Sequence, residues 1–121
     1  MKNQKFRNLQ IWQKAMDFVT AIYLLSSSFP VDERFGLTNQ IRRAGVSIAL
    51  NIAEGSGAGS DLEFRRFLKM ALRSAYEVMA ALEIASNLKF AKKDIIEARL
   101  QEADQLSAMI SGLIKKLKSD S

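Results

Sequence analysis

Helical periodicity dominates this sequence, because apolar residues recur every three or four positions in four blocks that short turn-like segments separate. Such spacing places apolar side chains along one face of a helix, whereas no segment shows the alternation that is typical of strands. We expect helices at about 9–29, 35–55, 61–89 and 93–118, after a basic N-terminal arm at 1–8. Short links between long helices favour antiparallel neighbours. The predicted fold class is therefore all-α, an antiparallel up-down-up-down four-helix bundle over 9–118.

Proline, glycine and a capping motif mark the predicted helix ends. Pro30 ends the first helix, because its ring lacks an N–H and disfavours helical geometry at the residue before it. The segment 55–60 contains three glycines and reads as the loop between the second and third helices. A helix precedes this loop and acidic residues follow it, so it does not match a phosphate-binding loop. Ser60 and Glu63 have the spacing of a capping box at the start of the third helix.

The first helix carries two parallel apolar rows. One row consists of Ile11, Ala15, Phe18, Ile22, Leu25 and Phe29, and the other consists of Leu9, Trp12, Met16, Val19 and Tyr23. One row is enough to dock a helix on a single core, so we assign the second row to a subunit interface. Trp12 and Tyr23 could instead stack on nucleic-acid bases, but their regular spacing favours burial in a core or an interface.

The composition excludes much familiar enzymology. The chain has no Cys and no His, which removes disulfides, thiolate catalysis, the commonest metal ligand and the usual general base. Asp61 and Glu63 are explained by helix capping, and Glu54 has no carboxylate partner on its helix face. We expect no catalytic residue, no metal and no cofactor. A carboxylate–metal nuclease centred on Glu54 is the remaining enzymatic alternative.

A net charge of +5 and a pI of about 9.7 favour anionic partners such as nucleic acid. Basic residues lie together on the second and third predicted helices, and like charges at helical spacing repel unless solvent or an anion compensates them. The candidate nucleic-acid contacts are Arg42, Arg43, Arg65, Arg66, Lys69 and Arg73. The alternative is a solvated surface with scattered ion pairs. No motif for reading a base sequence is present in the chain.

The 121 residues fit one domain. No stretch reaches the ~18 uninterrupted apolar residues of a membrane-spanning helix. Residues 1–8 are basic and polar, unlike a secretory signal, so we expect a cytoplasmic protein without a membrane partner.

Several segments resemble one known family. They are Leu9-Gln10-Ile11-Trp12-Gln13-Lys14-Ala15-Met16, Ser28-Phe29-Pro30, Glu33-Arg34-Phe35-Gly36-Leu37-Thr38-Asn39-Gln40-Ile41-Arg42-Arg43-Ala44, Val46-Ser47-Ile48 and Asn51-Ile52-Ala53-Glu54-Gly55. Together they resemble the bacterial four-helix bundle family of 23S ribosomal RNA intervening-sequence proteins. The family pattern usually has Pro-Ala where this chain has Ala49-Leu50, so no proline kink is implied here.

The resemblance implies a small bundle that assembles into a homo-oligomer, a ring of five, without a catalytic residue. The accessory protein of diversity-generating retroelements looks like a relative and is described as a basic pentamer that works with nucleic acid and a reverse transcriptase. Two functional hypotheses follow. The oligomer presents a basic surface to RNA or DNA, or it is a scaffold that docks a protein such as a polymerase or reverse transcriptase.

Overall fold

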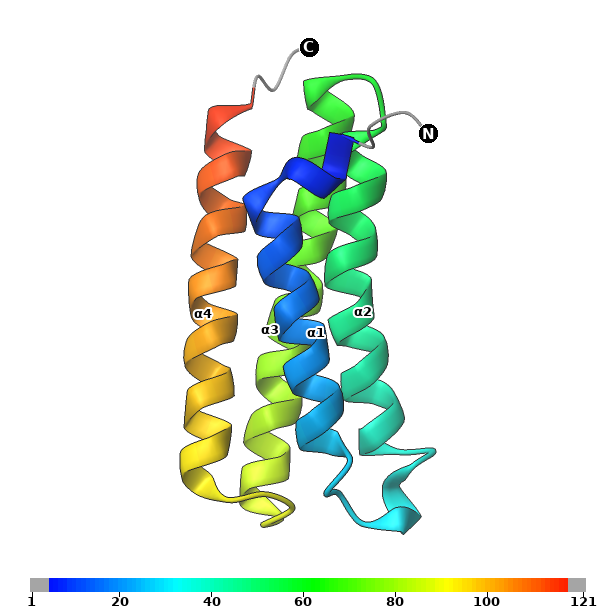
Figure 1. The fold of residues 1–121 in the computed structure, drawn as a ribbon, viewed down its shortest axis with the longest axis vertical. Coiled ribbons are helices and arrows are strands. Elements are labelled where there is room, and N and C mark those ends of the chain that lie inside the picture. Colours follow the sequence, from blue (N-terminus) through cyan, green and yellow to red (C-terminus); the bar gives the residue numbers. More distant parts are fainter. Residues whose placement is uncertain (1–4, 118–121) are drawn as a thin grey trace.

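The computed structural model describes residues 5–117 as a bundle of four long helices (Figure 1). The elements are η1 (Lys5–Asn8), α1 (Gln10–Ser26), η2 (Val31–Glu33), α2 (Leu37–Ser56), α3 (Asp61–Asn87) and α4 (Lys93–Lys116). Contacts join α1 to α2, α2 to α3, α3 to α4 and α4 to α1, whereas the described residues show none across either diagonal. The topology is therefore up-down-up-down, as predicted. No strand occurs between residues 5 and 117.

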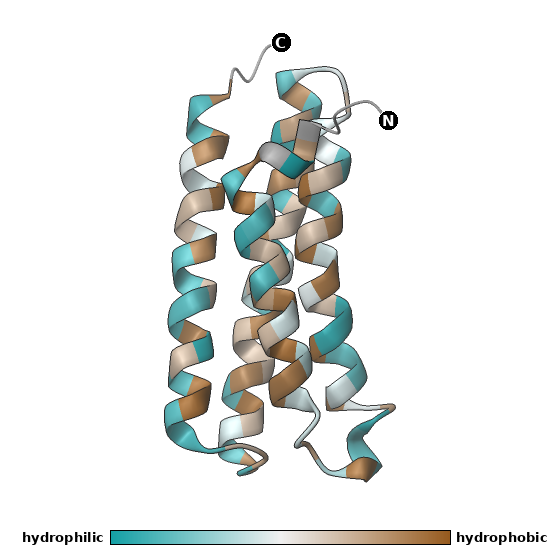
Figure 2. Cartoon of the chain, in the orientation of Figure 1, coloured by the Kyte–Doolittle hydropathy of each residue, from teal (hydrophilic) through white to brown (hydrophobic). Residues whose placement is uncertain are grey.

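The core lies where the predicted apolar rows of the four helices meet, and brown apolar positions recur along each ribbon (Figure 2). The first row of α1 is buried from Ile11 to Phe29. The other helices contribute fully buried aliphatic side chains, among them Ile41, Ile48, Ile52, Leu68, Val78, Leu82, Ile96 and Ile110. Burying a side chain of this size stabilises a fold by roughly 1.5–3 kcal/mol, so these rows supply the main driving force for the bundle.

The helix ends differ from the predicted ends by up to three residues. α1 ends at Ser26 instead of Phe29, because the hydroxyls of Ser26, Ser27 and Ser28 donate to the carbonyls of Tyr23 and Leu25 and compete with further helical bonds. α2 starts at Leu37, whose N–H donates to the Glu33 Oε1 atom at 3.0 Å. α2 then continues unbroken to Ser56.

α3 ends at Asn87, and Lys89 follows with a left-handed φ of 59°. Leu88 falls inside the predicted helix 61–89, but it lies beyond the end of α3 and is exposed. Of the predicted basic arm, residues 1–4 lie outside the described residues. Residue 118, the predicted end of the last helix, lies outside them too.

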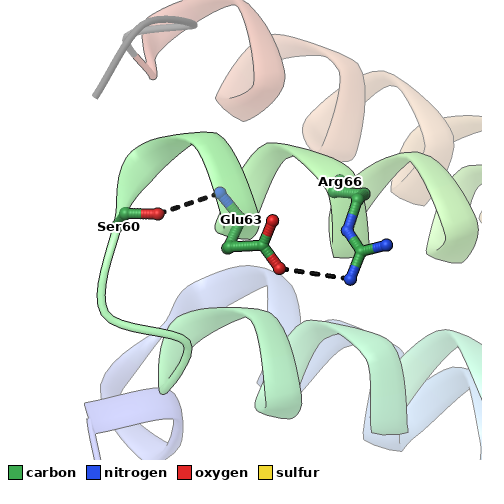
Figure 3. A network of polar contacts seen from close by, with 3 residues as sticks. All are labelled: Ser60, Glu63 and Arg66. Atoms are coloured by element: carbon green, nitrogen blue, oxygen red, sulfur yellow. Dashed lines mark hydrogen bonds and ion pairs between the residues drawn. The ribbon is translucent and has the colours of Figure 1, made fainter.

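The predicted cap of α3 is present in part (Figure 3). The Ser60 Oγ atom accepts a hydrogen bond from the Glu63 N–H at 3.1 Å, as the capping box predicts. The Glu63 carboxylate pairs with Arg66, one turn further along α3, at 3.1 Å. Gly59, just before the cap, has a φ of 91°, a backbone conformation that favours glycine.

Each end of the bundle carries its own set of charged and apolar side chains. One end holds both chain termini and the α2–α3 link, and the other holds η2 and the α3–α4 link (Figure 1). We call these the terminal end and the loop end. Basic side chains lie near both ends: Arg65, Arg66, Lys69, Lys115 and Lys116 near the terminal end, and Arg34, Lys89, Lys92 and Lys93 near the loop end. Exposed large apolar side chains gather toward the loop end: Leu24, Val31, Phe35, Ile84, Leu88 and Ile95.

Candidate nucleic-acid and subunit interfaces

The six predicted basic residues fall into two groups in the structure. Arg42 belongs to the group whose guanidinium donates hydrogen bonds to the chain itself. Its Nε atom donates to the Ser26 Oγ atom at 2.7 Å, and its Nη2 atom donates to the Tyr23 carbonyl at 3.2 Å and to Ser27 Oγ at 3.3 Å. The guanidinium also lies 4.5 Å from the centre of the Tyr23 ring. Arg42 therefore caps the C-terminus of α1, where the helix dipole favours positive charge.

Arg65 caps the C-terminus of α4 in the same way. Its Nη1 atom donates to the carbonyls of Ile114 and Leu117, in the last turn of α4 and just after it. Like Arg42, it is half-buried. These two guanidiniums tie neighbouring helices together at opposite ends of the bundle, so a role in binding an external anion would compete with bonds that they already make.

The other four basic residues are exposed. Arg66, Lys69 and Arg73 step by three and four residues along α3, so they share one outward face. We call these three residues the α3 basic row. The pair between Arg66 and Glu63 is itself exposed, with side chains 66% and 40% accessible, so a phosphate group can compete with it. The α3 basic row brings three of the four exposed cations among the predicted contacts onto one helix face.

Arg43, on α2, lies between two open grooves. One groove of about 690 Å³ follows α2 on the side of Tyr23 and Arg34, and the other, of about 470 Å³, reaches Glu77 on α3. Arg43, Asn39 and Ser47 line both grooves. Arg34 and Asn39 were not predicted as site residues. Asn39 lies four residues before Arg43, so helical spacing could have placed the two on one face, whereas only the fold brings Arg34 into the same groove.

The predicted subunit row is partly covered by the chain itself. Leu9, Trp12 and Val19 are half-buried against the core, and the Trp12 ring packs edge-on against Phe6 with centroids 4.9 Å apart. Met16 and Tyr23 remain 43% and 41% exposed. The single subunit therefore leaves two members of the row open, and the adjacent Leu24 is 72% exposed. The exposed apolar surface therefore includes fewer residues than the five of the predicted row, and it extends toward the loop end.

The residues of the alternative nuclease do not form a cluster. Glu54 is exposed near the end of α2, and within residues 5–117 no group of three or more acidic residues could hold a metal ion. None of the described helices has the length and apolar character needed to cross a membrane.

The fold and its surfaces define a small all-helical bundle with a basic face and with exposed apolar residues at one end. The match of a family model to residues 7–112 places the chain more closely: it belongs to the family of 23S rRNA-intervening sequence proteins. A crystal structure of a protein of unknown function from Bacteroides thetaiotaomicron, described as from the S23 ribosomal protein family, superposes with a TM-score of 0.80. The two chains are 27% identical, and the match covers 87% of this chain and 98% of the other. No curated protein matches this sequence.

Proposed function

We propose that this protein is a non-catalytic cytoplasmic homo-oligomer, a ring of five, that presents basic side chains to RNA or another nucleic acid. The observation that carries the nucleic-acid part of the proposal is the α3 basic row, three exposed cations on one helix face. Phosphate contacts of this kind position a protein on a nucleic acid without reading its sequence. Binding is therefore expected to depend on shape and charge more than on base sequence.

One observation supports self-assembly, and another is compatible with an RNA ligand. Met16, Tyr23 and Leu24 leave adjoining apolar surface uncovered on α1, and isolated subunits rarely expose such surface without a use for it. The family name refers to an intervening sequence of 23S rRNA, which is compatible with an RNA ligand. The ring of five rests on the family resemblance.

The salt dependence of binding tests the nucleic-acid proposal. A protein that neutralises phosphates releases counterions, so affinity for a structured RNA hairpin should fall steeply between about 50 and 200 mM salt. The variant Lys69→Gln/Arg73→Gln should bind more weakly, and its salt slope should fall by about two per bound subunit. Fluorescence anisotropy over a salt series measures both quantities.

The matched control is Lys89→Gln/Lys93→Gln, which removes the same charge from exposed positions at the loop end. This variant should retain most of the affinity. Absence of binding at low salt, or an affinity that does not change with salt, would contradict the proposal. Equal losses of RNA affinity in the two variants would show that binding depends on the net charge of the protein and not on a localised surface.

A second candidate function is a scaffold that docks a protein, such as a polymerase or reverse transcriptase. The outer face of α3 supports it, because beyond Arg73 it carries Tyr76 and Ile84, each about half exposed, beside the exposed acidic residues Glu77 and Glu83. A purified polymerase that binds the protein after nuclease treatment, and loses binding in Tyr76→Ser/Ile84→Ser, would favour the scaffold. A partner that is lost on nuclease treatment is bridged by nucleic acid.

A further inference from the structure

The larger of the two grooves beside Arg43 combines positive charge with an apolar floor, and we call it the α2 groove. Its volume of about 690 Å³ lies within the range of small-ligand sites, about 300–1,000 Å³. Tyr23 of α1 and Arg34, which follows η2, contribute to its lining, and the rest of the lining belongs to α2. The groove therefore runs along one helix and changes in chemistry from one end to the other.

Positive charge gathers in the half of the α2 groove nearer the loop end. Arg34 and Arg43 are exposed, and neither forms an ion pair among the described residues. Arg34 lies 5.1 Å from the centre of the Phe35 ring, an exposed contact with which a phosphate can compete. The one acidic residue in the lining, Glu54, is eleven residues beyond Arg43, about 16 Å along the helix axis. This half of the groove suits a phosphate group.

The middle of the α2 groove is apolar. Val46 is half-buried and Leu50 is 55% exposed, and the two lie one turn apart on one face of α2. The Tyr23 ring lines the same groove and is held in place by the Arg42 guanidinium, 4.5 Å from its centre. A flat nucleic-acid base covers apolar surface of this kind, whereas an acidic peptide brings only carboxylates to it.

A hydrogen-bond acceptor without a partner lies beyond the apolar floor. The Asn51 Nδ2 atom donates to the Ser47 carbonyl at 2.9 Å and to the Ser47 Oγ atom at 3.0 Å. Ser74 also donates to the Ser47 Oγ atom, at 2.9 Å, so this cluster fixes the Asn51 amide. The Asn51 Oδ1 atom makes no hydrogen bond within residues 5–117 and is left to accept one from a ligand. An exocyclic amine of a base is such a donor.

We propose that the α2 groove binds one unpaired nucleotide of a nucleic-acid strand. The phosphate pairs with Arg34 and Arg43, and the base covers Val46 and Leu50. An amine of the base donates to the Asn51 Oδ1 atom, which lies about 12 Å beyond Arg43 along the helix axis. This inference rests on the nucleic-acid function proposed above and adds a contact to a base, whereas the α3 basic row meets phosphates alone.

The proposed contact gives a modest preference among bases. Cytosine and adenine carry an exocyclic amine, whereas uracil places a carbonyl oxygen where cytosine has its amine. A second acceptor facing the Asn51 Oδ1 atom leaves both oxygens without a donor. Shape and charge still dominate the affinity, because a single hydrogen bond adds little to many phosphate contacts.

Two single strands that differ in this group test the base contact. Labelled oligocytidylate should bind the full chain about 2- to 10-fold more tightly than oligouridylate of the same length, the net effect of one hydrogen bond. Fluorescence anisotropy at low salt measures both affinities. Their ratio is the readout, because the α3 basic row contacts the phosphates of both strands alike.

Leu50→Asp and Ile95→Asp form a matched pair of variants. Each places one carboxylate at an exposed apolar position, 55% and 40% accessible in the parent, so the helical content should persist by circular dichroism. Leu50→Asp should abolish the preference for cytosine, because a charge on the floor excludes the base. Ile95→Asp, on α4 outside the groove, should keep the preference.

The phosphate contact is tested by Arg34→Gln/Arg43→Gln. This variant should lower the affinity for oligocytidylate by about 2- to 30-fold, the range for two exposed ion pairs. Lys89→Gln/Lys93→Gln removes the same charge from exposed positions at the loop end and should lower the affinity less. Equal losses in the two variants would overturn the proposed phosphate position.

Competition experiments identify the source of the bound group. If free CMP displaces the labelled strand at lower concentration than UMP does, a single nucleotide is enough to occupy the groove. If neither displaces it while the preference for cytosine holds, the groove requires a strand, and both results support the proposal. Displacement by an oligoglutamate of equal charge as effective as that by unlabelled oligocytidylate would show a surface for any polyanion and would overturn it.

The remaining outcomes separate this inference from the broader proposal. A parent protein that binds neither single strands nor a hairpin at low salt would overturn both. Hairpin binding that depends on Lys69 and Arg73, together with equal affinities for the two single strands, would overturn only the α2 groove. A preference for cytosine that survives in Leu50→Asp would place the base contact elsewhere on the molecule and would also overturn the groove.

Discussion

Replacing Gly55 with alanine is expected to destabilise the fold by about 1–3 kcal/mol, the usual cost of overpacking a tight core. Gly55 is buried near the end of α2, where it packs directly against α3. A Cβ atom added there would lie 2.7 Å from the Cβ atom of Phe67 and 2.9 Å from the Phe64 Cδ1 atom. The Phe67 contact involves an atom attached directly to the α3 backbone, so the two helices themselves must separate.

Gly112→Ala is the matched control for Gly55→Ala. Gly112 also lies inside a helix, α4, but a Cβ atom there would have no neighbour within 4 Å. Alanine favours a helix interior over glycine by up to about 1 kcal/mol, so this variant should be stabilised. Denaturant unfolding at one fixed protein concentration measures both changes. If Gly55→Ala were as stable as the parent, the close contact between α2 and α3 would not constrain this fold.

Replacing Arg42 with alanine is expected to cost about 1.5–3 kcal/mol, the range for hydrogen bonds to a charged group. The variant loses three donor contacts to the end of α1 and leaves the Ser26 hydroxyl, which is 2% exposed, without its cationic partner. Arg42→Lys should recover only part of this loss, because an ammonium group cannot reproduce the planar fork of donors. Unfolding curves for the two variants measure the difference.

Arg43→Ala is the internal comparison, since the neighbouring side chain is exposed and makes no hydrogen bond or ion pair within the described residues. Its stability should stay within about 0.5 kcal/mol of the parent. In the RNA-binding assay Arg43→Ala should weaken binding more than Arg42→Ala does, because Arg43 is free to meet phosphate and Arg42 is not. Equal stability of the two variants would contradict the capping role of Arg42.

The architecture could be predicted from local periodicity, and the roles of two arginines could not. Ile41, Ile48 and Ile52 follow helical spacing, and spacing alone places them on one buried face. The Ser60 cap was likewise predicted from residues three positions apart. In contrast, Arg65 bonds to carbonyls 49 and 52 residues away, a relation that depends on which helices become neighbours.

The same reasoning applies to the exposed apolar residues. The second row of α1 has helical spacing, but spacing does not show how much of it the other helices cover. In the structure Trp12 is half-buried and Tyr23 is exposed, because α1 ends at Ser26 and η1 folds back only over the first turn of α1. Phe35 was expected within the second helix, whereas the structure places it before α2 and leaves its side chain exposed.

Self-assembly is tested most directly by the mass of the native protein in solution. Multi-angle light scattering on the unmodified chain at micromolar concentration should give several times 13.5 kDa, and five times that value for the proposed ring. The expectation follows from apolar side chains that one bundle leaves uncovered at Met16, Tyr23, Leu24 and Phe35. A mass of 13.5 kDa that does not change with concentration would contradict it.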